Sequence, residues 1–297
     1  MRKPTVISLF AGVGGFDLGF VDAGYSIVCS TDRDKKAMKY NALNFKHRIL
    51  CQDVYKVCGE DLTRGQHIDV VIGGAPCQGF SMAGNRDVLD VRNQLIFEYV
   101  RLVKEIEPRY FVFENVGGIL TKLMKPIFDL FCIELEEDYN IKYAVLDASK
   151  YDVAQSRKRV IVLGWREGEL EPNFPTESQQ IKTVREAFLD VPFYSSVMHS
   201  QKRIDQFKLI RPGEACLVSL QARRLYWDKP AFTVTAYLKL IHPEYHRYIN
   251  NREAARLQSF PDSFVIDPSN SGGARQVGNA VPPLLAYAIA TELKKVL

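Results

Sequence analysis

The chain has 297 residues, of which 46% are hydrophobic and 25% are charged, a composition ordinary for a globular protein. Its formal net charge is only +4, and its six cysteines form no CxxC pair, which argues against a disulfide framework or a zinc site and suits a reducing compartment. A strand is predicted from Thr5 onward, so we expect no signal peptide, and no apolar run approaches the ~18 residues of a membrane helix. These features predict a cytoplasmic protein.

Short apolar runs alternate with helical patterns over the first 165 residues. The predicted strands are Thr5–Phe10, Tyr25–Ser30, Arg48–Gln52, Ile68–Ile72, Tyr110–Phe113, Ile141–Leu146 and Arg159–Gly164. The predicted helices between them are Gly15–Ala23, Asp34–Asn44, Asn93–Glu107 and Lys122–Tyr139. Strands that alternate with helices indicate βαβ units, and therefore an α/β fold with a doubly wound, mostly parallel sheet.

A glycine-rich turn follows the first predicted strand, at residues 11–16. Such a turn lets a ligand approach backbone amides at a helix N-terminus, but Asp17 replaces the third glycine of the dinucleotide fingerprint and weakens a pyrophosphate interpretation. Asp32 and Asp53 follow the second and third strands, where an acid can bind ribose hydroxyls or simply cap the next element. An adenosine-bearing ligand without a diphosphate fits best, and S-adenosyl-L-methionine is the candidate.

The segment Gly73–Ser81 places Cys77 just beyond a predicted buried strand. Its glycines allow sharp turns and close approach to a ligand, and Pro76 fixes one backbone angle beside the thiol. Strand ends of an open α/β sheet are where such folds carry their chemistry. Cys77 is therefore a candidate nucleophile, with a small buried apolar cysteine as the alternative.

Two further segments carry charged groups at strand ends. Glu114 ends the strand that begins at Tyr110, and it points to the same crevice as Cys77 if the two strands are neighbours. Arg157 and Arg159 share a face in an extended segment, because side chains alternate with period two. Two guanidinium groups on one face favour an anion or carboxylate site, and a plain basic loop is the alternative.

The alternation of strands and helices stops after Trp165. Residues 167–180 are rich in acids and helix breakers, and residues 181–251 are irregular, aromatic and basic, with a strand candidate at Ala231–Tyr237. The window 201–260 holds eleven Lys and Arg against five Asp and Glu, which indicates a polyanion partner or an ordinary solvated face. Helical patterns return at 252–258 and 283–296. We predict domains at 1–180 and 181–251, with 252–297 returning to the first.

Taken in order, these segments resemble the DNA (cytosine-5)-methyltransferase family of the bacterial restriction–modification type. The resemblance covers nearly the whole chain and rests on Leu9–Gly15, Gly73–Ser81, Glu114–Val116, Gln155–Arg159, Arg223–Thr235, Arg252–Asp262 and Gln276–Pro283. It implies an S-adenosylmethionine-dependent methyltransferase fold with 1–180 as the catalytic and cofactor-binding domain. The region 181–251 would be a smaller, irregular target-recognition domain.

The resemblance also implies a mechanism. Cys77 would add to carbon 6 of a cytosine flipped out of duplex DNA, which makes carbon 5 nucleophilic toward a methyl donor. Glu114 would hold or protonate ring nitrogen 3, and Arg157 and Arg159 would orient the base. The loop from Gly79 to Arg92 would close over the flipped base as a lid.

For the cofactor, the resemblance implies that Phe10 stacks near the adenine, Asp32 binds the ribose and Asp53 meets the adenine amino group. The other expected cofactor-binding residues are Ala11, Gly12, Gly14, Gly15, Pro76, Leu95, Asn279 and Val281. Two positions depart from the pattern: many relatives carry Glu where this chain has Asp32, and Asp where it has Ser8. Part of the contact to the methionine end of the cofactor is therefore unassigned.

The expected partners are duplex DNA and, functionally, a cognate restriction endonuclease; we expect a monomer without a metal. Three alternatives remain at this stage. The same chemistry could act on tRNA, although the Cys-Phe-Thr segment of that branch is absent here. A non-catalytic DNA-binding module is disfavoured because the four candidate catalytic residues are present, and a nicotinamide oxidoreductase because the third glycine is missing.

Overall fold

A computed structural model describes residues 2–76, 94–191, 198–216 and 219–297. The chain divides into two compact units, which we call unit 1 (Met1–Leu146, Lys158–Thr176 and Ala286–Leu297) and unit 2 (Asp147–Arg157 and Glu177–Leu285). These bounds differ from the expected domains. Residues 147–157 belong to unit 2, and only the segment from Ala286 onward returns to unit 1.

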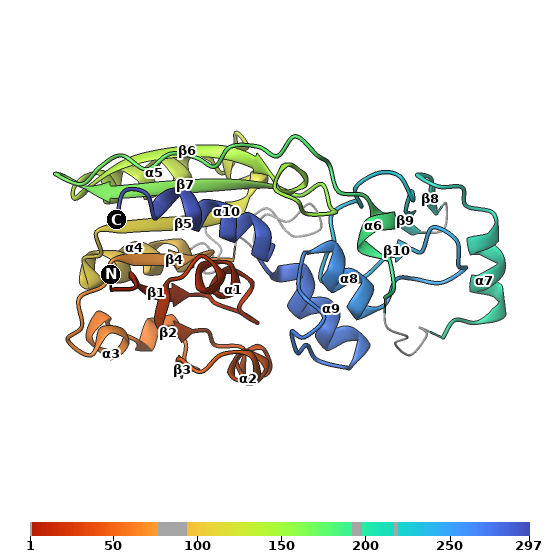
Figure 1. Ribbon diagram of the computed structural model, residues 1–297, viewed down its shortest axis with the longest axis horizontal. Coiled ribbons are helices and arrows are strands. Elements are labelled where there is room, and N and C mark those ends of the chain that lie inside the picture. The colour runs from red at the N-terminus through yellow and green to blue at the C-terminus, as the bar shows by residue number, and fades with distance from the viewer. Residues whose placement is uncertain (1, 77–93, 192–197, 217–218) are drawn as a thin grey trace. The chain divides into compact units, whose positions relative to one another are not determined.

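Unit 1 is built on a seven-stranded sheet with the order β3-β2-β1-β4-β5-β7-β6 (Figure 1). The strands are β1 (Thr5–Leu9), β2 (Ser26–Thr31), β3 (Arg48–Leu50), β4 (Val70–Gly73), β5 (Tyr110–Val116), β6 (Tyr139–Asp147) and β7 (Lys158–Arg166). The pairs from β3 through β5 are parallel, and β7 runs antiparallel to β5. The predicted α/β class with a mostly parallel sheet is confirmed, and the carboxyl ends of β1, β2, β4 and β5 meet at one edge.

Helices cover both faces of this sheet (Figure 1). They are α1 (Gly15–Asp22), α2 (Lys35–Asn44), α3 (Gly59–Thr63), α4 (Gln94–Ile106), α5 (Lys125–Glu136) and α10 (Pro283–Leu293), with short 3-10 turns η1 (Val54–Lys56) and η4 (Gly117–Leu120). None of the helices in the described ranges is long and apolar enough to span a membrane.

Alternation along β5 shows how the sequence produces two covered faces. Phe111 and Phe113 pack into the main core with α4 and α5, where Tyr99 lies 4.9 Å from Phe113 between ring centroids. Tyr110 faces the other way, and its hydroxyl donates to the carbonyl of Val296, just beyond α10. Successive strand residues therefore fill opposite cores, which is why the strand reads as a continuous apolar run.

Unit 2 contains short elements around a small core. They are α6 (Val184–Ala187), α7 (Gln201–Lys208), β8 (Ala215–Cys216), β9 (Ser219–Arg224), β10 (Leu240–Ile241), α8 (Asn251–Leu257) and α9 (Asn270–Asn279). The strands form a small sheet in the order β10-β9-β8. Its core comprises Phe207, Ile210, Ala222, Ile241 and Tyr248.

The strand expected at Ala231–Tyr237 is absent from the described part of unit 2 as a regular element. Ala231 forms a single bridge with Gln155, and the backbone N–H of Val234 donates to the side chain of Gln155 at 2.6 Å. A side-chain amide thus satisfies a backbone group that a neighbouring strand would otherwise take. The prediction of a strand there was wrong for this reason.

The helix α8 explains why residues 252–285 stay in unit 2. Its N-cap residue Asn250 accepts from the backbone N–H of Glu253, and Glu253 forms a two-pronged ion pair with Arg247. These bonds tie the helix to the preceding irregular segment. The segment therefore packs where its capping and ion-pair partners lie.

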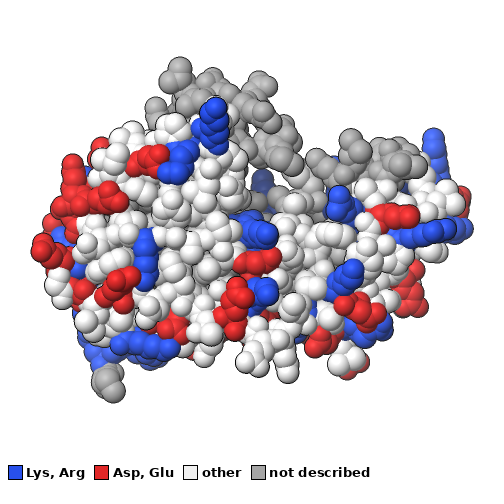
Figure 2. Space-filling model, turned by 90° about the horizontal axis from the view of Figure 1, so that it is seen from above, with Lys and Arg blue, Asp and Glu red and all other residues white. Residues whose placement is uncertain are grey.

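Burial also changes the meaning of the basic surplus in residues 201–260. Arg224 and Arg252 are both 3% exposed and donate to backbone carbonyls inside unit 2. Arg247 and Arg256 are held in ion pairs with Glu253 and Asp262. Figure 2 shows Lys and Arg interspersed with Asp and Glu over one face of the molecule. Much of the surplus is thus internal structure and not a basic surface.

Candidate active site

Glu114 and Arg159 form an ion pair near the carboxyl end of β5. Arg159 enters β7 opposite Val116, and its Nε lies 2.8 Å from Glu114 Oε1. Both side chains are nearly buried, at 11% and 12% exposure for Arg159 and Glu114. In such a position the acid is stabilised by a directed, charge-assisted hydrogen bond.

The same strand end holds the backbone that leads toward Cys77. A Cβ atom at Gly74 would lie 3.0 Å from Glu114 Oε2, so glycine allows the chain to pass close to the carboxylate. The side chain of Asn115 donates to the carbonyl of Ala75 at 3.0 Å. The described chain continues to the half-buried Pro76, while Cys77 and the expected lid 79–92 lie outside the described residues.

Arg157 has a different environment from Arg159. It belongs to unit 2, is 3% exposed, and donates to the carbonyls of Val234 at 2.9 Å, Gly278 at 2.9 Å and Ala280 at 3.2 Å. The structure therefore brings Arg159 to an acid and Arg157 to backbone carbonyls. Period-two alternation did not anticipate that division.

The glycine-rich turn after β1 is tightly folded. Phe10 has φ 54°, Gly12 φ 55° and Gly14 φ 98°, all in the left-handed region. For a bulky residue such as Phe10 this conformation is costly, and such strain concentrates at ligand sites. The backbone N–H of Ala11 donates to the carbonyl of Thr31, which binds the turn to the end of β2.

Asp32 closes this turn from the next strand end. One carboxylate oxygen accepts from the N–H of Gly12 at 3.0 Å and the other from the N–H of Asp34 at 2.8 Å. Burial raises the pKa of Asp32, and the two backbone donors oppose that change. Asp53 caps η1 by accepting from the N–H of Tyr55, the capping role that the sequence left open.

The remaining predicted cofactor residues lie in both units. Leu95 belongs to the main core of unit 1, whereas Asn279 is exposed at the end of α9 and Val281 is buried, both in unit 2. A polar cluster beneath the turn, which contains Ser8 and Asp17, was not predicted. The available signal was a serine at a core position of an otherwise apolar strand.

The turn fits a nucleoside-bearing methyl donor. A Cβ atom at Gly12 would meet nothing within 4 Å, so space lies open beside the turn, and an acid stands at the next strand end. Among the residues of the described ranges, no group of His, Cys, Asp and Glu could hold a metal ion. The chemistry of these donors suits ribose and amide recognition better than a metal.

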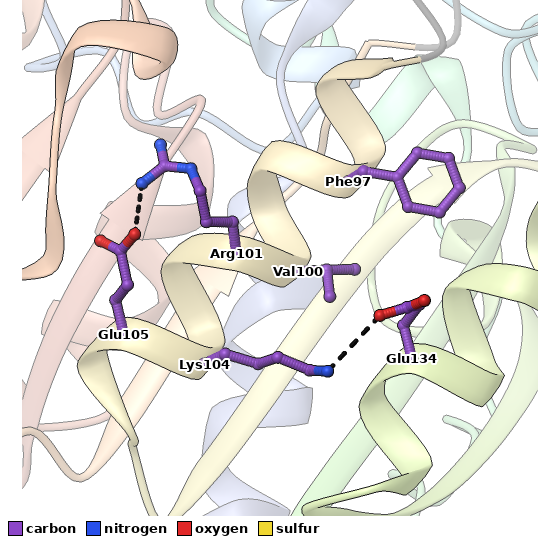
Figure 3. A pocket seen from close by; sticks show the side chains of 6 residues that line it. All are labelled: Phe97, Val100, Arg101, Lys104, Glu105 and Glu134. Atoms are coloured by element: carbon purple, nitrogen blue, oxygen red, sulfur yellow. Dashed lines mark hydrogen bonds and ion pairs between the residues drawn. The ribbon is translucent and has the colours of Figure 1, made fainter.

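A separate surface pocket of about 390 Å³ lies between α4 and α5 (Figure 3). Phe97 and Val100 line it together with paired charges: Arg101 with Glu105 at 2.6 Å, and Lys104 with Glu134 at 3.4 Å. The residues that line this pocket come from α4 and α5, and none of them belongs to the strand-end site.

Comparison with known proteins gives a consistent result. The model of the C-5 cytosine-specific DNA methylase family matches residues 4–215 and 194–295. The Type II methyltransferase M.XorII of Xanthomonas oryzae pv. oryzae is 34% identical over 100% of this chain and 86% of its own length. The Type II methyltransferase M1.HphI of Haemophilus parahaemolyticus is 35% identical over 98% and 87%.

Solved structures show the same architecture. A putative DNA modification methyltransferase encoded within an E. coli prophage superposes with a TM-score of 0.88 at 27% identity, covering 99% of each chain. The Dnmt2 methyltransferase of S. pombe, at 19% identity and a TM-score of 0.74, shares the fold.

The seven-stranded α/β fold and these relatives define an S-adenosylmethionine-type α/β methyltransferase fold. The chain belongs to the C-5 cytosine-specific DNA methylase family and is a DNA (cytosine-5)-methyltransferase.

Proposed function

We propose that this enzyme transfers a methyl group from S-adenosyl-L-methionine to carbon 5 of a flipped-out cytosine in a specific duplex DNA sequence, through a covalent adduct with Cys77. The observation that carries the proposal is the Glu114–Arg159 pair at the end of β5, with Glu114 Oε2 against Gly74, three residues before Cys77. Addition of a thiolate to a pyrimidine ring requires an acid near the nucleophile, and Glu114 lies against the backbone that leads to Cys77.

In this mechanism the chain first makes the base reactive. The Cys77 thiolate forms a bond to carbon 6, and the electrons of the 5,6 double bond move toward carbon 5 and the ring. Glu114 holds a proton at ring nitrogen 3, where negative charge would otherwise develop. Arg159 keeps the Glu114 carboxyl in place through the bond from its Nε.

Bound S-adenosylmethionine supplies an electrophilic methyl group for carbon 5. Phe10, Ala11, Gly12, Gly14 and Gly15 would form its cradle, with Asp32 at the ribose. After methylation, a base takes the proton from carbon 5, the bond between carbon 6 and sulfur breaks, and Cys77 leaves as a thiolate. S-adenosylhomocysteine would be the co-product of the transferred methyl group, and the thiolate of Cys77 would be free for another cycle.

The proposed cofactor set is completed by Asp53, Pro76, Leu95, Asn279 and Val281. Arg157 would help to orient the base indirectly, because it holds the backbone at Val234 and Gly278 through hydrogen bonds to their carbonyls. Residues 181–251 would recognise the DNA, since phosphate contacts position such a domain and a few side chains read base edges. We further propose a monomer in the cytoplasm, with a restriction endonuclease as its functional partner.

The decisive experiment uses duplex DNA that carries 5-fluorocytosine. Fluorine cannot leave as a proton does, so the enzyme should remain attached to the DNA, and denaturing electrophoresis should show one shifted band. Bisulfite sequencing of a plasmid from expressing cells supplies the recognition sequence with which the duplex is built.

Two variants sharpen this test. Cys77→Ala should bind DNA and cofactor without forming the shifted band, and Cys51→Ala, a change at an exposed cysteine, should form it normally. A wild-type enzyme that binds both substrates yet forms no adduct would exclude the covalent mechanism. Methylation of tRNA but not duplex DNA in parallel assays would instead exclude the proposed substrate.

A further inference from the structure

A buried polar cluster lies beneath the glycine-rich turn of unit 1, and the mechanism above gives it no role. It consists of Ser8 from β1, Asp17 from α1, Ser30 from β2, Asn41 from α2 and His47 just before β3. The first four side chains are at most 1% exposed, and that of His47 is 8% exposed. Five polar side chains inside a hydrophobic unit need a compensating set of bonds.

Asp17 is the centre of this cluster. Ser8 Oγ donates to Asp17 Oδ1 at 2.5 Å, and both Ser30 Oγ and Asn41 Nδ2 donate to Oδ2, at 2.7 and 3.2 Å. Three donors thus satisfy the Asp17 side chain in the first turn of α1, where a helix N-terminus favours negative charge.

His47 completes the set as a donor. Its Nε2 lies 2.7 Å from Ser30 Oγ, and the single hydroxyl hydrogen of Ser30 is directed to Asp17, so the ring must supply the hydrogen between them. Burial lowers the pKa of His47, and the nearby Asp17 carboxylate opposes that change.

Asn41 connects the cluster to the turn. The same Nδ2 that donates to Asp17 also lies 3.4 Å from the carbonyl of Gly12, whose N–H is bound to Asp32. A Cβ atom at Gly14 would lie 2.9 Å from this nitrogen, so the turn packs directly against it. The carbonyl of Gly12 is thus linked to Asp17 through Asn41, and the N–H of Gly12 is bound to Asp32.

This arrangement also defines the role of Ser8, whose hydroxyl donates to Asp17. Because Ser8 and Asp17 are hydrogen-bonded to each other, a carboxylate can reach nearly the same place either from the strand or from the helix. In this chain the helix provides the carboxylate and the strand provides the hydroxyl.

We propose that Asp17 is a positioning residue for the cofactor, which holds the glycine-rich turn in its binding shape through Asn41 without touching the ligand. The proposal rests on the proposed use of S-adenosylmethionine at this turn. The carboxylate of Asp17, hydrogen-bonded to Ser8, would thus support the turn through Asn41.

The test measures binding of S-adenosylhomocysteine by calorimetry, together with steady-state kinetics on duplex DNA. Asp17→Asn removes the negative charge and leaves one acceptor oxygen where Ser8, Ser30 and Asn41 supply three donors to two oxygens. We expect Kd and the KM for the cofactor to rise about tenfold, with kcat at saturating cofactor changed less than about twofold. Asp22→Asn, at an exposed acid of the same helix, should match the wild type.

A carboxylate exchange separates positioning from damage to the fold. Ser8→Asp alone places two carboxylates in contact, and Asp17→Ser alone removes the carboxylate, so each should weaken binding about tenfold or more. The double variant S8D/D17S restores one carboxylate and one hydroxyl, and we expect binding within about threefold of wild type. Thermal unfolding without cofactor checks that each variant is folded.

The outcomes are distinguishable. Asp17→Asn binding as tightly as the wild type, or a double variant weaker than both single variants, overturns the positioning role while leaving the proposed function intact. A fall in kcat equal to the rise in KM also overturns it, because the residue would then act on the reaction step. Failure of the unmodified enzyme to bind S-adenosylhomocysteine overturns the proposed function, and the positioning role with it.

Discussion

Three neighbouring residues hold the side chain of Glu114 and the backbone beside it in place. Arg159 holds one oxygen, Gly74 leaves room for the other, and the adjacent Asn115 fixes the carbonyl of Ala75. A carboxylate at 12% exposure is costly without such compensation. The role proposed for Glu114, at ring nitrogen 3 of the target base, gives a reason for this cost.

At the scale of this residue we predict that Glu114→Gln lowers kcat by about 10²–10³-fold, because the amide cannot hold or deliver a proton at nitrogen 3. The neutral side chain keeps the shape, so DNA binding should change little. Single-turnover methylation with labelled cofactor measures the effect.

The matched control is Glu134→Gln, which removes the acid of another ion pair, the one with Lys104 at the surface pocket between α4 and α5 (Figure 3). Its activity should equal that of the wild type. Equal losses in both variants would mean that Glu114 acts through stability and not through the reaction.

How far single residues could be predicted depends on what their partners are. The sequence identified Glu114 and Arg159, and the structure brings them together because β5 and β7 are adjacent. Arg157 shows the limit: its partners are three carbonyls from distant segments, and no local pattern encodes them. Cys77 remains a prediction, since it lies outside the described residues.

At the scale of elements, strand β9 carries two neighbouring arginines with opposite environments. Arg224 is buried and donates to the carbonyls of Phe207, Ile210 and His242, at 2.6 to 2.7 Å. Arg223 is exposed and stacks over the ring of Phe232. One strand thus directs one cation into the small core and the next one outward.

We predict that Arg224→Met lowers the free energy of unfolding of unit 2 by about 3 kcal/mol or more, since several buried carbonyls lose a charged donor. Arg223→Met should cost less than about 0.5 kcal/mol. Urea unfolding followed by intrinsic fluorescence compares the two variants. Equal losses in the free energy of unfolding would contradict a structural role for the hydrogen bonds of Arg224.

Most elements of unit 1 were predictable, because its helices have an apolar face with helical period and its buried strands are short apolar runs. Its apolar runs and helical patterns correspond to β1 through β7 and to α1, α2, α4 and α5. In unit 2 the helical pattern at 252–258 corresponds to α8, but α7 and β9 were not predicted, because they are ordered by a small core and by Arg224. Tertiary contacts, and not local propensity, decide their conformation.

At the scale of the whole molecule, His242 makes stability depend on pH. Its Nδ1 accepts from the backbone N–H groups of Glu244 and Tyr245, and its ring stacks on Tyr245 and Phe188. Burial lowers the pKa of His242 to about 4, although Glu253 opposes the change. Protonation of the ring would also place a hydrogen against two donors.

Between pH 6.5 and pH 4 the unfolded chain therefore takes up a proton at this position that the folded chain does not. Stability is fully present above the unfolded pKa and is lost as the pH falls toward the folded value. We predict a loss of about 3 kcal/mol from this group, absent in His242→Gln, in urea unfolding at pH 7 and pH 4. Parallel losses in wild type and variant would contradict it.

The return of the last segment to unit 1 has a consequence for how the protein is made. The Tyr25 hydroxyl donates to the carbonyl of Ala290, and the Tyr110 hydroxyl donates to the carbonyl of Val296. The Lys294 ammonium group donates to the carbonyl of Ala23. During synthesis the sheet emerges first, and the part of its cover that residues 286–297 provide follows only after all of unit 2. Until then, the parts of the sheet that those residues bury stay exposed to solvent.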